Sequence, residues 1–279
     1  MSNPSSSTGS LRPLVVKIGG SEGVDRAAVC TDIAAIVRGG QPVVVVHGGS
    51  HDTNQLCQRL GIPVRTITSP SGHTSRRTDA QTLQAFQMAC RGIINQQLVT
   101  LLLGQGVNAV GLSGLDARLW QGERKGAVRA IENGVTVIIR DDYTGSVEQA
   151  DPRLLSLLLD AGYTPVISPP AISTQGEAIN VDADRAAART AAAVRAETLV
   201  LLSNVPGVLE RFPDESSLVS RVSRERVEEY VGLAQGRMKK KIMSAGEALR
   251  DGVSTVVIAD ARVPEPVRSA LSGKGTRFE

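Results

Sequence analysis

Short apolar runs alternate along the chain with longer segments in which apolar positions recur every three to four residues. The runs are rich in valine and isoleucine, which favours buried strands, whereas the longer period is typical of helices with one buried face. The pattern predicts strands at 14–18, 42–47, 107–112, 164–168, 198–202 and 254–259, and helices at 25–39, 50–60, 78–104, 151–161, 183–195, 223–234 and 238–250. Shorter β-like runs within 127–150 predict a hairpin excursion.

This alternation predicts an α/β fold in which a central, mostly parallel sheet is covered by helices on both faces, as a three-layer sandwich. Pro169-Pro170 interrupts the pattern. We place a lobe boundary just after it, with an N-lobe at 11–172 and a C-lobe at 173–279, and we expect both lobes to contribute strands to one sheet. The serine-rich residues 1–10 show neither period, which predicts a disordered tail.

Two predicted strands end in glycine pairs, Gly19-Gly20 and Gly48-Gly49, each at a predicted helix start. A helix N-terminus offers free N–H groups to an anion, and glycine lets that anion approach the backbone. Lys17 ends the first strand, where a buried cation is costly without a partner. Two such turns could hold one polyphosphate, although glycine after a buried strand can also simply close a turn. Neither turn fits a P-loop or a dinucleotide fingerprint.

Composition narrows the class of protein. Hydrophobic residues make up 41% and charged residues 21% of the chain, which is ordinary for a globular protein. The net charge is only +3, the basic residues are spread out and aromatics are 3%, so we expect no nucleic-acid partner. No run of 18 apolar residues occurs, so we expect no membrane partner. Cys30, Cys57 and Cys90 lack metal-ligand spacing, which favours reduced thiols in a cytoplasmic protein.

Polar residues at two further helix starts are candidates for anion or metal binding. Arg76 lies in a polar segment that leads into the long helix, where it is placed to bind a carboxylate or is simply solvated. Asn180 ends a short apolar run, and Asp182 and Asp184 follow it at the start of the alanine-rich helix. The two carboxylates could bind Mg²⁺, or one of them could cap the helix.

Two more segments point to phosphate and nucleotide chemistry. Lysines 239–241 lie at the start of a predicted helix, where their charge opposes the helix dipole and a nearby anion would relieve that cost. Three consecutive lysines are nevertheless usually a solvated face. Ser203, Asn204 and Gly207 follow a predicted strand in a turn suited to the sugar or base edge of a nucleotide.

Taken in this order, these segments resemble the amino acid kinase superfamily, and within it the acetylglutamate kinase branch, over residues 13–277. The resemblance implies the amino acid kinase fold, an N-lobe that binds the acyl substrate and dimerises, and a C-lobe that binds the nucleotide. It implies ATP and Mg²⁺ as cofactors, with Mg²⁺ arriving with ATP and no protein ligand assigned to it. The implied site residues are Lys17, Gly19 and Gly20 at the phosphates, Gly48 and Gly49 at the γ-phosphate and acyl group, Arg76 at the substrate α-carboxylate, Asn180 at the substrate, Asp184 as organiser of the catalytic lysines, and Lys241 at the phosphates.

Three departures from plain acetylglutamate kinases, together with one further segment, look like one subgroup of that family. Residues 180–184 read Asn-Val-Asp-Ala-Asp, residues 111–116 lack the usual lysine, and the polar loop that ends at Arg76 is longer. The further segment, residues 140–145, reads Arg-Asp-Asp-Tyr-Thr-Gly. The subgroup acts on substrates held by the small, acidic amino-group carrier protein LysW. The resemblance implies ATP-dependent phosphorylation of the side-chain carboxylate of carrier-bound α-aminoadipate or glutamate, which yields an acyl phosphate. The alternatives are a free N-acetylglutamate kinase of arginine biosynthesis and, from another class, a non-catalytic regulatory or binding module.

Charge and hydrophobicity indicate two protein partners. Arg118, Arg124 and Lys125 lie beside the predicted hairpin excursion and form a candidate basic rim for the acidic carrier, or a rim that is merely solvated. The long helix carries more apolar residues than one face of a surface helix needs, which predicts a homodimer built on it, as in related kinases. These apolar positions are Leu83, Phe86, Ala89, Ile93, Ile94, Leu98 and Leu101.

Overall fold

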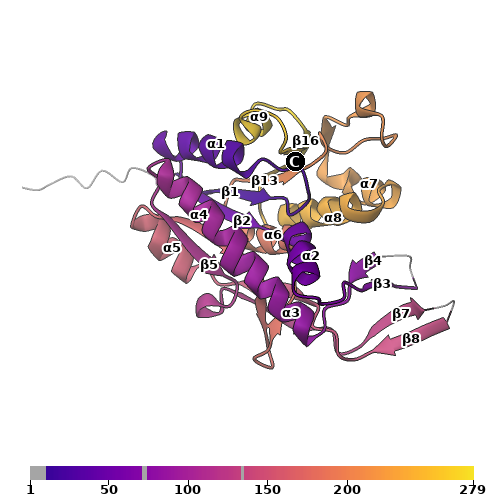
Figure 1. Cartoon of the computed structure of the whole chain (residues 1–279). Helices are drawn as coiled ribbons and strands as arrows, with labels where there is room; N and C mark the ends of the chain where they lie inside the picture. Colours follow the sequence, from indigo (N-terminus) through magenta and orange to yellow (C-terminus); the bar gives the residue numbers. More distant parts are fainter. Residues whose placement is uncertain (1–10, 71–73, 133–134) are drawn as a thin grey trace, which may run out of the picture.

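An eight-stranded sheet forms the centre of the computed structural model, which describes residues 11–70, 74–132 and 135–279 (Figure 1). The strand order is β14-β16-β15-β13-β1-β2-β10-β5. Every neighbouring pair from β15 to β5 is parallel, and β16 is antiparallel to β15. The bounds are β1 Leu14–Ile18, β2 Val43–His47, β5 Ala109–Ser113, β10 Thr164–Ser168, β13 Thr198–Ser203, β14 Arg221–Val222, β15 Thr255–Asp260 and β16 Thr276–Phe278. The tail predicted at 1–10 lies outside the described residues.

Helices cover both faces of this sheet, which confirms the predicted three layers (Figure 1). One face packs against α1 (Arg26–Arg38), α4 (Asn95–Gly104) and α9 (Pro266–Leu271). The other face packs against α5 (Arg153–Asp160), α6 (Ala183–Ala193), α7 (Val227–Leu233) and α8 (Gly236–Arg250). β13, from the predicted C-lobe, lies directly beside β1, from the predicted N-lobe, so both predicted lobes contribute strands to one sheet.

The alternation of side chains along β1 decides which layer each residue meets. Leu14, Val16 and Ile18 belong to the core beneath α1, α4 and α9, and Val15 belongs to the core beneath α6 and α8. Because side chains alternate with a period of two, Lys17 faces the same side as Val15. The sequence of β1 therefore directs one buried lysine toward α6 and α8.

Two hairpins extend from the body of the protein, and we call them together the arm (Figure 1). They are β3 (Thr66–Thr68) with β4 (Thr74–Arg76), and β7 (Val128–Glu132) with β8 (Val135–Ile139). The hairpins pack on each other through a small apolar cluster of Ile67, Ala130 and Ile139. The β7–β8 hairpin lies within the predicted excursion at 127–150. A second, four-stranded sheet connects this hairpin to the body of the protein. The strands of the second sheet are β6 (Trp120–Arg124), β9 (Gly145–Ala150), β11 (Ala171–Ser173) and β12 (Ala178–Ile179).

The long helix predicted at 78–104 is present with an irregular middle. Asp79 caps α3 (Ala80–Gln87) by accepting from the Thr82 N–H at 2.9 Å, and a π-helical segment, Met88–Ile94, joins α3 to α4. Helix α2 (Ser50–Arg59) follows the second glycine pair. The sequence patterns did not predict β6, the β3–β4 hairpin, α9 or β16. These elements are short, and contacts with residues distant in the chain stabilise them. No helix in the described ranges combines the length and apolar character needed to cross a membrane.

Candidate active site

The predicted cluster of Lys17, Asp184 and Lys241 is assembled at one point in the structure. The Lys17 Nζ lies 2.6 Å from Asp184 Oδ1, and the Lys241 Nζ lies 3.1 Å and 3.0 Å from Asp184 Oδ1 and Oδ2. The three residues come from β1, α6 and α8, which are far apart in the sequence, and all three are buried. One carboxylate thus holds two ammonium groups side by side, with a surplus of one positive charge.

Helix capping explains why Asp184 is available for the two lysines. Asp182 is the N-cap of α6, and its side chain accepts from the N–H groups of Asp184 at 2.9 Å and Arg185 at 3.2 Å. The capping interpretation of Asp182 is therefore confirmed. Because one cap suffices, the Asp184 carboxylate points instead toward β1 and α8 and binds the lysines.

The electrostatics of the cluster favour the charged form of Asp184 and disfavour that of Lys241. Burial alone would raise the pKa of Asp184, but the ammonium groups of Lys17 and Lys241 hold that pKa well below its usual range. Burial lowers the pKa of Lys241 to about 8, although the Asp184 charge opposes the shift; the Lys17 charge adds to it. The cluster is consequently prepared to receive an anion that would compensate its extra positive charge.

The two glycine pairs touch each other beside this cluster. A Cβ built on Gly20 would lie 2.6 Å from the Gly49 nitrogen and 2.8 Å from the Gly48 carbonyl carbon, and a Cβ on Gly48 would lie 3.7 Å from that of Ala183 at the start of α6. Gly49 is the N-cap of α2 and makes no side-chain cap hydrogen bond. The His51 N–H in the first turn of α2 donates to the Gly20 carbonyl oxygen at 3.0 Å, so the two turns and the start of α2 are joined at the carboxyl ends of β1 and β2, an arrangement that suits a phosphate chain.

Arg76 lies against the same turn. Its Nη2 donates to the Ser50 carbonyl oxygen at 2.6 Å and to Ser50 Oγ at 3.1 Å. Its Nε is buried and has no hydrogen-bond partner within the described part of the chain, and burial lowers the pKa of the guanidinium. A buried, unpaired N–H on a cation favours an anionic ligand, as the prediction of carboxylate binding requires.

Asn180 lies on the arm side of the site. Its Nδ2 donates to Thr78 Oγ1 at 2.9 Å, and its backbone N–H donates to the Tyr143 carbonyl oxygen at 2.8 Å. The Thr78 N–H in turn donates to the buried Asp142 at 2.9 Å. Thr78 Oγ1 also donates to the Arg76 carbonyl oxygen at 3.5 Å, so this network connects Asn180 to the backbone of Arg76 at the base of the arm.

Comparison with known proteins places this geometry in a family. The model of the amino acid kinase family matches residues 12–260. The chain belongs to the amino acid kinase family. A LysW-aminoadipate kinase from Thermus thermophilus is 54% identical over 265 residues, which cover 94% of this chain and 98% of that protein. An acetylglutamate kinase from Symbiobacterium thermophilum is 40% identical over 258 residues, which cover 91% and 85%.

Solved structures confirm the amino acid kinase fold. The N-acetylglutamate synthase from Neisseria gonorrhoeae, complexed with coenzyme A and N-acetyl-glutamate, gives a TM-score of 0.76 at 26% identity; the match covers 96% of this chain but 59% of the synthase. Carbamate kinase from Giardia lamblia bound to AMP-PNP gives a TM-score of 0.67 at 15% identity and covers 96% and 98%. The second likeness concerns the fold alone.

In this amino acid kinase, the predicted nucleotide residues lie at the carboxyl end of β13, with Ser203 as its last residue, at the same sheet edge as the glycine turns. The Ser203 carbonyl oxygen accepts from the Ala261 N–H at 2.7 Å. Gly207 has a packing role, since a Cβ there would lie 2.6 Å from Thr276 Oγ1 and 2.8 Å from Leu218. Asn204 is exposed at this edge. Ser203 and Asn204 thus remain predicted nucleotide contacts, whereas Gly207 shapes the turn.

The three predicted rim residues lie in different surroundings. Arg124 donates to Glu177 at 2.8 Å and to the carbonyl oxygens of Asp142 and Arg140, and its guanidinium lies 3.9 Å from the centroid of the Tyr143 ring. It therefore fastens the base of the arm. Arg118 precedes β6 and Arg124 ends it, so about 17 Å of strand separates them. Lys125 is exposed beside the arm.

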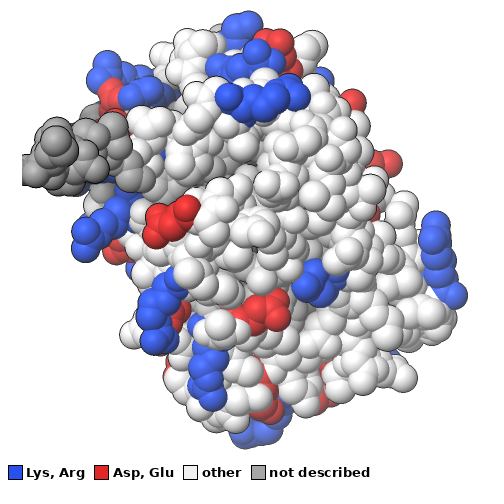
Figure 2. Space-filling model, turned by 90° about the vertical axis from the view of Figure 1, so that its left-hand side faces the viewer, with Lys and Arg blue, Asp and Glu red and all other residues white. Residues whose placement is uncertain are grey.

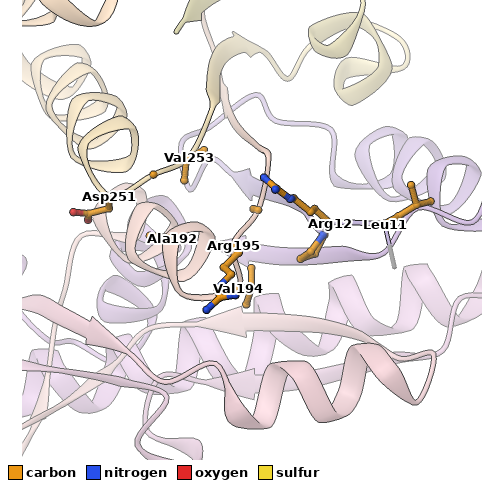
Figure 3. Close-up of a pocket in the computed structure, with 10 residues that line it drawn as sticks. Leu11, Arg12, Ala192, Val194, Arg195, Asp251 and Val253 are labelled. Atoms are coloured by element: carbon orange, nitrogen blue, oxygen red, sulfur yellow. The ribbon is translucent and has the colours of Figure 1, made fainter. Parts of the chain in front are cut away.

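A pocket of about 500 Å³ lies away from the candidate site (Figure 3). It is lined by residues 11–13, which precede β1, and by residues around the ends of α6 and α8, including Arg195 and Asp251. The amino end of β1 is the opposite edge of the sheet from Lys17. The pocket is consequently separate from the cluster of lysines and glycine turns.

The pKa of Lys241 leads to a prediction about pH. We expect kcat/KM for the nucleotide to fall as pH rises through about 8, because the free enzyme then loses the Lys241 ammonium that we predict to meet the phosphates. Bound phosphates favour the protonated form, so the same decline in kcat should begin at higher pH. Steady-state pH profiles of both parameters test this. A flat profile of kcat/KM up to pH 9.5 would contradict it.

Proposed function

We propose that this protein is an ATP-dependent carboxylate kinase that phosphorylates the side chain of α-aminoadipate, or glutamate, carried by LysW. One observation carries the proposal: the Lys17–Asp184–Lys241 cluster lies beside two touching glycine turns. The chain that contains this arrangement is 54% identical to a LysW-aminoadipate kinase. The names of its relatives supply the substrate. The geometry supplies a reason for phosphoryl transfer.

The chemistry needs charge neutralisation more than proton transfer. A side-chain carboxylate with a pKa of about 4 is already ionised at neutral pH, so it attacks without a general base. The obstacle is the approach of one anion to another. Lys17 and Lys241 would neutralise the phosphates, Asp184 would hold the lysines in place, and the glycine N–H groups would bind the transferring oxygens. Arg76 would bind the substrate α-carboxylate.

We propose that Mg²⁺ enters with the nucleotide. The described residues contain no group of three or more His, Cys, Asp or Glu side chains that could hold a metal ion. Asp184, the buried carboxylate of the site, is already bound to two ammonium groups. Mg²⁺ commonly retains water and takes its ligands from substrate phosphates, where it supplies further charge neutralisation.

The arm is the surface that we propose for the carrier. It continues directly from Arg76 at the end of β4 and lies next to the Asn180 network. Lys125 and Arg129 are exposed there, whereas Arg124 is occupied by Glu177. Exposed cations next to the substrate-binding end suit a small acidic protein. We therefore revise the proposed rim to Lys125 and Arg129, with Arg124 as its support.

Steady-state kinetics with carrier-bound α-aminoadipate and with N-acetylglutamate test the function. We expect turnover of the carrier-bound substrate, with a KM that rises with ionic strength because salt screens rim charges. The double variant Lys125→Glu with Arg129→Glu should raise this KM at least about tenfold and leave the KM for ATP unchanged.

The matched control is Arg12→Glu with Arg195→Glu, which changes the net charge equally at the opposite edge of the sheet. It should behave like the wild type. Efficient, salt-insensitive phosphorylation of free N-acetylglutamate would replace the carrier proposal by the acetylglutamate kinase alternative, which the Symbiobacterium relative keeps open. Absence of ATP turnover with either substrate would favour the non-catalytic module.

We also propose a homodimer, which keeps only Ile93 of the residues that the sequence indicated and adds Met88 and Leu103. Of the seven apolar positions named on the long helix, six pack wholly or partly inside the protomer and only Ile93, at 46%, is substantially exposed. Met88 and Leu103 are 55% and 52% exposed on the same helical segment, and β5 beside it is an edge strand. Figure 2 shows broad areas without charged residues on the side where α1 and α5 lie.

Light scattering should therefore give the mass of two chains. Ile93→Glu with Leu103→Glu should give one chain, because charges would replace the exposed apolar contacts. A wild-type monomer would exclude this interface. The three free cysteines of the described residues are buried, which suits the reducing cytoplasm that we propose as the location.

A further inference from the structure

A buried histidine lies directly behind the second glycine turn. His47 is the last residue of β2 and is 1% exposed. Its Nδ1 lies 2.9 Å from the carbonyl oxygen of Gly48, and its Nε2 lies 3.1 Å from the Asn95 Nδ2. The imidazole therefore connects the glycine turn to the start of α4.

The hydrogen bonds of Asn95 fix the state of this ring. The Asn95 Oδ1 accepts from the Arg91 Nη1 at 2.9 Å, and its Nδ2 donates to the Val166 carbonyl oxygen at 2.9 Å. The Nδ2 group can only donate, so the His47 Nε2 is the acceptor and the hydrogen sits on Nδ1. The His47 Nδ1–H consequently donates to the Gly48 carbonyl oxygen.

Burial keeps the ring neutral. It lowers the pKa of His47 to about 4, and the charges of Arg26 and Lys17 lower it further, while the Gly48 hydrogen bond and Asp52 act in the opposite direction. Above about pH 5 the imidazole is therefore uncharged and keeps one tautomer. A neutral ring adds no charge to the phosphate site, so it can act only through the group that it holds.

The π-helical segment braces the same turn from the other side. A Cβ built on Gly49 would lie 2.6 Å from Cys90 Sγ and 2.7 Å from Ile94 Cδ1, both within that segment, and Asn95 follows it as the first residue of α4. The wide helical turn thus brings three side chains to the Gly48–Gly49 peptide and its histidine. π-helical turns often occur at functional sites.

From this arrangement we infer that His47 is a positioning residue for phosphoryl transfer, which rests on the proposed kinase function. In a trans peptide the C=O and the following N–H point in opposite directions. By holding the Gly48 carbonyl oxygen in the core, His47 directs the Gly49 N–H away from it, toward the touching turn of Gly20. The donor is thereby aligned before the substrate arrives, and Asn95 keeps the imidazole in the tautomer that this requires.

The experiment compares His47→Ala with His47→Asn. His47→Ala should lower kcat about tenfold or more with little change in the KM values, because a misdirected donor weakens the transition state while the lysines still bind the phosphates. His47→Asn should recover much of the loss, since its Nδ2 can take the place of the imidazole Nδ1–H. Adding Asn95→Ala to His47→Ala should cause less than the multiplied effect of the two changes, because both act on one hydrogen-bonded chain.

Thr190→Val is the matched control. It removes two other buried side-chain hydrogen bonds, the one that Thr190 Oγ1 accepts from Trp120 Nε1 at 2.9 Å and the one that it donates to the Ala186 carbonyl oxygen at 2.7 Å. It should lower the melting temperature and leave kcat unchanged. Equal kcat values for His47→Ala and the wild type, or an equal loss in Thr190→Val, would overturn the inference. A wild type without ATP turnover would instead refute the proposed function.

Discussion

Replacing Lys17 or Lys241 by methionine is expected to lower kcat by at least about a hundredfold, as the loss of a preorganised charge usually does. Each ammonium group is buried and held by Asp184 before any ligand arrives, so neither must be ordered during the reaction. Methionine keeps most of the side-chain volume and removes the charge. The measurement is kcat at saturating ATP and carrier-bound substrate, with circular dichroism as the test of folding.

Lys239→Met provides the control on the same helix. Lys239 is exposed near the start of α8, so its loss should leave kcat within about twofold of the wild type, as expected for a surface site. Near-wild-type kcat in a folded Lys17 or Lys241 variant would remove that lysine from the mechanism. The remaining lysine and the glycine turns would then have to bind the phosphates alone.

Gly20→Ala should have an effect of similar size through geometry rather than charge. The added Cβ would come within 2.6 to 3.0 Å of three backbone atoms, belonging to Gly48, Gly49 and Ser50. Backbone atoms cannot swing aside as a flexible side chain can, so the two turns must separate. A displacement of about 1 Å at a reacting centre can cost a hundredfold in rate. We expect that loss in kcat.

Gly104→Ala is the corresponding control, because a Cβ there meets nothing within 4 Å. It lies at the end of α4, and its kcat should match that of the wild type. A fully active Gly20→Ala enzyme would show that the two turns do not act on one phosphate chain. The proposal that both glycine pairs hold the same ligand would then fail.

Local signals explain which parts of this site could be predicted from sequence. Neighbouring residues in the sequence are enough to predict the strand that carries Lys17, the glycine pairs and the capping role of Asp182. The structure also brings Lys17 and Asp184 together, as the resemblance implied. Arg124 shows the limit. Its partner Glu177 is 53 residues away, so nothing near Arg124 in the sequence distinguishes a structural cation from a solvated one.

Most of the apolar positions that predicted a dimer on the long helix are instead packed inside the protomer, for a related reason. The π-helical segment Met88–Ile94 changes the register between the two halves of the helix. Leu83 and Phe86 then face one cluster while Ile94 and Leu98 face another. The buried polar pair of His47 and Asn95 was missed as well, although a histidine directly before a glycine pair was visible in the sequence.

The alanines of α6 determine how long the acidic side chain at position 184 must be to contact Lys17 and Lys241. Ala186, Ala187, Ala188 and Ala191 are fully buried, so the helix lies close to the sheet and to α8. That short spacing suits aspartate, whose carboxylate is one methylene nearer the backbone than that of glutamate. The size of the residues between α6 and the sheet and the length of the acidic side chain at position 184 must therefore match. An enzyme with a larger residue under α6 would need a longer acidic side chain to hold both lysines. Either change alone would misplace the lysines.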